Sequence, residues 1–164
     1  MLQLKKGLFS CFLLFTLFGC GYSLHGRASL PFDAIQIGTI ENKTVEPKLQ
    51  DRLYTALTEE FLKQGITVSP DAGYKLSGTI KQFSLLVLSE KGDIATEYEI
   101  VMKGDFILVD PSGKQKELKD IGSPFIVSFS GAGPLEGLIA SKELASEKAI
   151  RDMAMQVVGA LTYR

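Results

Sequence analysis

Histidine, tryptophan and cysteine are the residues this sequence has least of. Its 164 residues include one histidine, no tryptophan and two cysteines. A single histidine, His25, argues against multi-histidine metal sites and most histidine-based catalysis, and two cysteines are too few for a disulfide framework. An excess of either charge is also missing, because 18 Lys+Arg stand against 19 Asp+Glu. This balance argues against a nucleic-acid binder with a dense basic surface.

Motifs that bind nucleotides or carry catalysis are absent from the sequence too. There is no HExxH, paired CxxC, GxxxxGK[ST] or GxGxxG. Glu97 and Glu99 lie two residues apart on an expected strand, so their carboxylates share one face. Such a pair most often marks the solvent side of a sheet. We expect no enzyme, and a periplasmic hydrolase that uses Glu97 and Glu99 is the least favoured alternative.

The N-terminus has the organisation of a secretory signal peptide. Lys5 and Lys6 precede an almost wholly apolar run, Leu8–Phe18. As a helix this run would extend about 16 Å, whereas the core of a bilayer is about 30 Å thick. It is therefore too short to span a membrane but fits the apolar region of a signal peptide. The alternative, an N-terminal core helix, is less favoured because the run has no polar face.

A candidate lipidation site follows this run directly. Leu17-Phe18-Gly19-Cys20 resembles a bacterial lipobox, after which the thiol of Cys20 would carry diacylglycerol and its freed amine an N-acyl chain such as palmitate. Several acyl chains hold a protein on a membrane where one binds only marginally. Gly21, in place of Asp, favours sorting to the outer membrane. The alternative is a free thiol. No other cofactor and no metal is expected.

These signals divide the chain into three parts. Residues 1–19 are the expected signal peptide, residues 20–33 the lipidated N-terminus and tether, and residues 34–164 a single domain. The length of the last part suits one domain with an ordinary hydrophobic core.

Periodicity within the domain predicts an α+β fold with the order β-α-β-β-β-α. The expected architecture is a mixed four-stranded sheet with two helices packed on one face. A bulge is expected near Gln82–Ser84, a hairpin tip at Glu90–Asp93, and a loop at Ser130–Gly137. Because the apolar stripe of the last helix meets Glu143 and Glu147 when projected backward, its first turns should extend past the core. The six elements are Ala34–Ile40, Pro47–Gln64, Lys75–Leu88, Thr96–Asp110, Glu117–Phe129 and Ser141–Leu161.

The face of the sheet opposite the helices is predicted to be partly apolar. Val101, Ile107 and Val109 alternate with the expected core residues of their strand, and the segment Phe83–Leu88 is apolar on both faces. An exposed apolar patch of this size marks an interaction surface, so we interpret the face as partner-binding. Alternatively, the strand ends extend past the helices and their side chains meet each other.

Several segments together resemble the LptE family of lipopolysaccharide-assembly lipoproteins. The cysteine is followed by Gly21-Tyr22, and three further stretches share the likeness, which covers most of residues 20–161. They are IQIGTIENKTVEPKLQDRLYTALTEEF (35–61), KLSGTIKQFSL (75–85) and TEYEIVMKGDFIL (96–108).

The resemblance implies a function. Such a protein would be lipid-anchored in the inner, periplasmic leaflet of the outer membrane and would sit as a plug within the β-barrel LptD, whose assembly it assists. Contact with lipopolysaccharide is also implied, and because its phosphates bind Lys or Arg, Lys91 and then Lys148 are the candidate residues. The alternative is another envelope lipoprotein, such as a regulator that docks on a cell-wall synthase.

Overall fold

The computed structural model describes residues 30–92, 94–122, 127–131 and 134–162. The predicted α+β class, with two helices on a mixed sheet, is confirmed. The described residues form β1 (Ala34–Asn42), α2 (Leu49–Lys63), β2 (Thr67–Val68), β3 (Lys75–Lys91), β4 (Ile94–Val109), β5 (Gln115–Gly122), β6 (Val127–Ser130) and α3 (Leu135–Thr162).

The predicted count of four strands was wrong, because the described residues form a six-stranded sheet. Its order is β2-β1-β3-β4-β5, with β6 also paired to β4. The short β2 was not predicted. The predicted strand Glu117–Phe129 is two strands that pair with different parts of β4. β5 lies beside residues 103–109 and β6 beside residues 97–100. β1 runs parallel to β2 and β3, and the other pairs are antiparallel.

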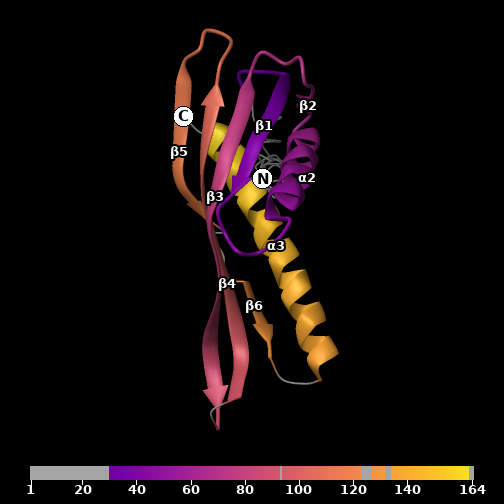
Figure 1. Cartoon of the computed structure of the whole chain (residues 1–164). Helices are drawn as coiled ribbons and strands as arrows, with labels where there is room; N and C mark the ends of the chain where they lie inside the picture. Colours follow the sequence, from indigo (N-terminus) through magenta and orange to yellow (C-terminus); the bar gives the residue numbers. More distant parts are fainter. Residues whose placement is uncertain (1–29, 93, 123–126, 132–133, 163–164) are drawn as a thin grey trace, which may run out of the picture.

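The main core lies between the upper part of the sheet and the two helices, which cover the same face (Figure 1). Apolar residues that recur at helical spacing from Leu49 to Phe61 predict a buried stripe on α2. This stripe is buried, as is the stripe predicted for α3. Residues before β1 also contribute, since Leu30 and Phe32 are buried in this core. The alternation in β4 is confirmed, because Ile100, Met102, Phe106 and Leu108 are all buried.

The β3–β4 hairpin extends well beyond the rest of the sheet (Figure 1). The pairing of β1 with β3 ends at Ile80, and the pairing of β5 with β4 ends at Lys103. Past these points β6 is the one strand among the described residues that lies beside the hairpin, on the β4 side. The N-terminal half of α3 covers β4 and β6 there and forms a second, smaller core of Ile100, Phe129, Ala145 and Ala149.

A bulge in β3 marks where this overhang begins. The register shifts between Ile80 and Gln82, at Lys81, which is one residue before the predicted range Gln82–Ser84. One extra residue resets the alternation of a strand. The shift therefore places Phe83, opposite the buried Met102, on the same face as Ile80.

Both helices begin at other residues than predicted. α2 begins at Leu49, not at Pro47, because Lys48 adopts a left-handed backbone conformation with φ 61°. α3 begins at Leu135, six residues before Ser141, so the loop predicted for Ser130–Gly137 is wrong at both of its ends. Its first turns do pass the main core, but they pack on the second core through Leu138.

Candidate partner-binding surface

The most apolar exposed segment of the described chain lies on the overhanging part of β3. Leu85, Leu86, Val87 and Leu88 are consecutive and 43–47% exposed. Successive residues of a strand point to opposite faces, so apolar side chains are exposed on both faces of the hairpin. Leu135 and Ile139, in the first turns of α3, are exposed at the same end of the molecule (Figure 1). Contiguous apolar exposure of this kind is typical of an interaction surface.

The three residues named from the sequence do not form one cluster. Val101, Ile107 and Val109 lie on the face of β4 opposite the helices, since they alternate with buried residues. Ile107 is 38% exposed, and the other two are half-buried. Val101 pairs with Ser84 in the overhang, whereas Ile107 pairs with Ser77 in the upper sheet, about 20 Å away at 3.4 Å per residue.

The sequence prediction named Val101, Ile107 and Val109 and also noted the segment Phe83–Leu88, and the structure exposes the second set more than the first. The signal was the uninterrupted run from Phe83 to Leu88. Its exposure depends on β1 and β5 ending where they do, which no local pattern predicts.

A charged cluster on the open face holds three strands together at the start of the overhang. Lys81 Nζ lies 2.9 Å from Asp105 Oδ2 and 3.3 Å from Asp120 Oδ1. The backbone N–H of Asp120 donates to Asp105 Oδ1 at 2.8 Å. This N–H, and then Lys81, lower the pKa of Asp105, while the two aspartates raise the pKa of Lys81. The cluster links β3, β4 and β5 and leaves no carboxylate in an enclosed site.

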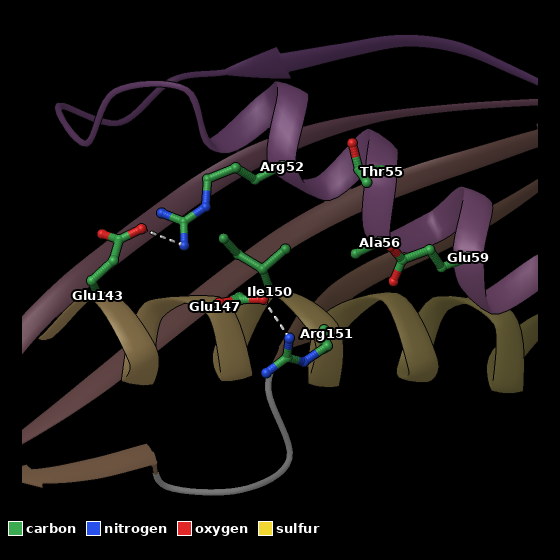
Figure 2. Close-up of a pocket in the computed structure, with 8 residues that line it drawn as sticks. All are labelled: Arg52, Thr55, Ala56, Glu59, Glu143, Glu147, Ile150 and Arg151. Atoms are coloured by element: carbon green, nitrogen blue, oxygen red, sulfur yellow. Dashed lines mark hydrogen bonds and ion pairs between the residues drawn. The ribbon is translucent and has the colours of Figure 1, made fainter. Parts of the chain in front are cut away.

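A second charged group lines a shallow groove between the two helices, with a volume of about 270 Å³. Figure 2 shows Arg52 of α2 and Glu143 of α3 pointing toward one another across it, with 2.9 Å between Arg52 Nη2 and Glu143 Oε1. Arg151 pairs with Glu147 along α3. Exposed pairs of this kind contribute at most about 1 kcal/mol. The Arg52–Glu143 pair links the two helices, whereas the Arg151–Glu147 pair lies within α3.

The two lysines proposed for lipopolysaccharide lie in different settings. Lys91 is exposed at the end of β3, beside Gly92 in the turn, and makes no salt bridge within the described residues. Lys148 lies in the middle of α3, where its Nζ is 2.7 Å from Asp152 Oδ2. Asp152 is buried, so Lys148 already has a structural partner. The structure does not bring the two lysines together.

Glu97 and Glu99 lie on the open face of the overhang. Glu99 is opposite Leu86, and Glu97 is opposite Ser89. Among the residues that the structure describes, neither carboxylate takes part in a salt bridge. No group of three or more potential metal ligands occurs in that part of the chain.

Cys20 and Cys11 lie outside the described residues, so lipidation of Cys20 stays a prediction. Of the helices in the described ranges, none is both long and apolar enough to cross a bilayer.

Most of the chain matches a known protein family. Residues 32–161 match the family described as "LptE: Lipopolysaccharide-assembly". The chain belongs to the LptE family. This confirms the resemblance found in the sequence, and the LptE match includes the whole overhanging hairpin and all of α3 but the last residue. No curated protein is similar enough in sequence to count as a match.

Three solved structures with a similar fold are lipoproteins by their descriptions. Lipoprotein B of Nitrosomonas europaea has a TM-score of 0.56 at 16% identity, covering 84% of this LptE-family chain and 88% of its own. A minor lipoprotein of Acinetobacter baumannii has a TM-score of 0.54 at 15% identity, with 82% and 93% covered. A lipoprotein of Caulobacter crescentus has a TM-score of 0.50 at 20% identity, with 75% and 87% covered. At these identities the likeness concerns the fold.

Proposed function

We infer that this LptE-family protein is a non-catalytic lipoprotein of the outer membrane. It forms a complex with an LptD-type β-barrel, as plug and assembly partner for the insertion of lipopolysaccharide at the cell surface. The observation that carries this proposal is the overhanging hairpin, whose four exposed apolar residues 85–88 have nothing to cover them within the described chain. A larger partner would remove that apolar surface from water.

The anchor is proposed to be diacylglycerol and an N-acyl chain on Cys20, in the periplasmic leaflet, after removal of residues 1–19. Residues 20–33 would then connect it to the single domain, residues 34–164. Leu30 lies at the end of the molecule far from the hairpin tip, since it lines a groove with Asp110, Lys114 and Leu161. The tether and the exposed hairpin therefore leave the domain at opposite ends.

Lipopolysaccharide would be contacted by basic side chains. Lys91 is the better candidate because it is exposed at the tip, and a phosphate there would gain a charge-assisted hydrogen bond. Lys148 would have to share its ammonium group with Asp152. Val101, Ile107 and Val109 would face the barrel, with Leu85–Leu88 as the larger part of the contact.

Co-purification tests the proposed partner. The tagged full-length protein, extracted in mild detergent, should bring down an LptD-type barrel in a stoichiometric amount. Ile107→Asp should reduce the recovered barrel while the thermal midpoint of the isolated protein changes little. Recovery of a cell-wall synthase without any barrel would contradict the proposal, and so would collapse of the isolated Ile107→Asp protein.

The anchor is tested separately by mass and by location. Intact-mass spectrometry should find the chain beginning at Cys20 with its acyl chains attached. Cys20→Ala should leave the domain folded but release it from the membrane fraction. Cys11→Ala is the matched control, because this thiol lies in the segment expected to be removed, and it should stay at the wild-type level. An uncut, unmodified chain would refute the anchor.

A further inference from the structure

The overhanging part of β3 is an open sheet edge. β1 ends opposite Ile80, and the last bond on that side runs from the N–H of Lys43 to the carbonyl oxygen of Ile80, 3.0 Å away. From Gln82 onward β3 pairs with β4 alone among the described strands. The ten residues Gln82–Lys91 thus have a strand neighbour on one side only among the described residues, and strand edges of this length attract other strands.

The hydrogen bonds between neighbouring strands show which way each backbone N–H and C=O group of this edge points. The carbonyls of Tyr74 and Ile80 face β1, and the carbonyl of Thr96 in β4 faces β6, where it accepts from Gly131. Direction alternates along a strand, so the odd-numbered residues of β4 bond to β3. Their partners there are Gln82, Ser84 and Leu86. The N–H and C=O groups of Phe83, Leu85 and Val87 therefore point outward.

This edge lacks two of the features that normally protect one. Natural edges often carry charges or proline, whereas residues 82–89 (QFSLLVLS) contain no charge and no proline. Register shifts flank the run of regular pairing from Gln82 to Val87. A lipid surface does not suit it, because unpaired backbone groups in hydrocarbon cost several kcal/mol each. A polypeptide strand satisfies both the outward N–H and C=O groups and the exposed apolar side chains.

Charge further specifies the strand that fits. On the open face, Glu99 lies across from Leu86 and Glu97 across from Ser89, and no salt bridge neutralises them within the described chain. A strand added next to β3 would lie two strand spacings from these carboxylates, about 9.6 Å, within reach of a long basic side chain. On the helix-covered face, Leu85 lies opposite Ile100 and would meet apolar residues.

We propose that an extended segment of the partner adds to this edge along Gln82–Ser89, with apolar side chains on the helix-covered face and Lys or Arg on the face of Glu97 and Glu99. This rests on the proposed function, which makes the barrel protein the source of the segment. Main-chain hydrogen bonds would then give affinity, and the alternating side chains would give specificity.

Proline substitutions separate the contribution of the backbone hydrogen bonds at this edge from the contribution of the side chains. Leu85→Pro removes an outward N–H and keeps an apolar ring, Leu85→Ala keeps the N–H, and Leu86→Pro removes an N–H directed at β4. With the full-length protein and its co-expressed barrel, Leu85→Pro should reduce the apparent affinity about tenfold or more, and Leu85→Ala at most about threefold. Leu86→Pro should lower the thermal midpoint, whereas Leu85→Pro should leave it within a few degrees of wild type.

Amide hydrogen exchange gives a second readout that needs no substitution. The amides of Phe83, Leu85 and Val87 should exchange fast in the free protein and become protected in the barrel complex. Those of Gln82, Ser84 and Leu86 should be protected in both states. Val87→Pro repeats the test at another outward N–H, so unfolding of both Leu85→Pro and Val87→Pro would overturn the assigned directions.

Failures of the two proposals can be told apart. If the wild-type protein recovers no barrel, the proposed function fails and this inference with it. If the barrel is recovered equally by Leu85→Pro and Leu85→Ala, only the edge pairing fails. A wild-type dimer without barrel that Leu85→Pro converts to monomer would overturn the inference in favour of pairing between two copies of this chain.

Discussion

We predict that the second core lets the hairpin open separately from the rest of the domain, and Phe129→Ala tests this. Phe129 is 9% exposed and packs with Ile100, Ala145 and Ala149. Its ring stacks on Tyr98 with 5.3 Å between the centroids. Apart from the partly buried Phe83, which touches both, the two cores share no residue. Loosening one should therefore leave the other largely intact.

The burial of the Phe129 ring sets how much free energy the Phe129→Ala substitution costs the hairpin. Truncation of a buried phenylalanine to alanine costs about 3–5 kcal/mol, and loss of the stack is part of that cost. The second core has four buried members, a small cluster, so we expect the lower value, about 3 kcal/mol. At 1.4 kcal/mol per tenfold change, local opening of the hairpin should increase about 150-fold.

Amide exchange read by region distinguishes local from global loosening. In Phe129→Ala, exchange in residues 94–101 should accelerate about 150-fold, while exchange in α2 and the thermal midpoint change little. Leu57→Ala is the matched control, because Leu57 is fully buried in the main core, and it should accelerate exchange in α2 and lower the midpoint. An equal acceleration in α2 and in the hairpin of Phe129→Ala would refute the division into two cores.

Three further predictions concern packing, pH and ligand. Gly78→Ala should lower the free energy of unfolding by about 1–3 kcal/mol, because an added Cβ would lie 2.3 Å from the buried Phe106 ring. Gly137→Ala is the control and should not lower it, because its Cβ would meet nothing nearer than 4.0 Å. Equal thermal midpoints for the two variants would contradict the close approach. The pKa of Asp105 lies below its ordinary value of 3.8, so its stabilisation is present above that pH and is lost as pH falls through the lower folded value. The thermal midpoint of wild type should therefore fall more steeply below about pH 4 than that of Asp105→Asn. If the midpoints of the two proteins fell in parallel with pH, the Asp105 carboxylate would not contribute this stabilisation. Lys91→Gln should weaken binding of purified lipopolysaccharide severalfold, and Lys114→Gln, at the other end of the molecule, should not; unchanged binding in both would remove Lys91 as a contact.

Regular elements with one consistent pattern were predictable from the sequence. The α2 stripe from Leu49 to Phe61 is buried as expected, because a long helix with one apolar face can be packed in only one orientation. The start of α3 was not predictable, since the glycines and the proline of residues 130–137 (SGAGPLEG) look like a loop. There the contact of Leu138 with the second core overrides local preference.

The division of the predicted strand Glu117–Phe129 also depends on tertiary structure. β5 and β6 pair with separate parts of β4. The alternation of apolar and polar residues in one strand therefore need not continue in the other. For the candidate site, the apolar run of β3 was visible in the sequence, but its open edge was not. That edge exists because β1 ends opposite Ile80, and the end of one strand cannot be read from the residues of its neighbour.

The geometry of α3 limits where the hairpin can lie relative to the proposed anchor. α3 has 28 residues and is about 42 Å long at 1.5 Å per residue. Its C-terminal end, at Leu161, lines the same groove as Leu30, and its N-terminal end lies beside the hairpin (Figure 1). The ten residues from Cys20 to Leu30 reach at most about 36 Å. An acylated Cys20 therefore could not hold the molecule upright with its hairpin tip on the leaflet that carries the anchor. With this anchor the hairpin would lie along the membrane or point away from that leaflet, and the proposed partner segment beside β3 would lie there with it.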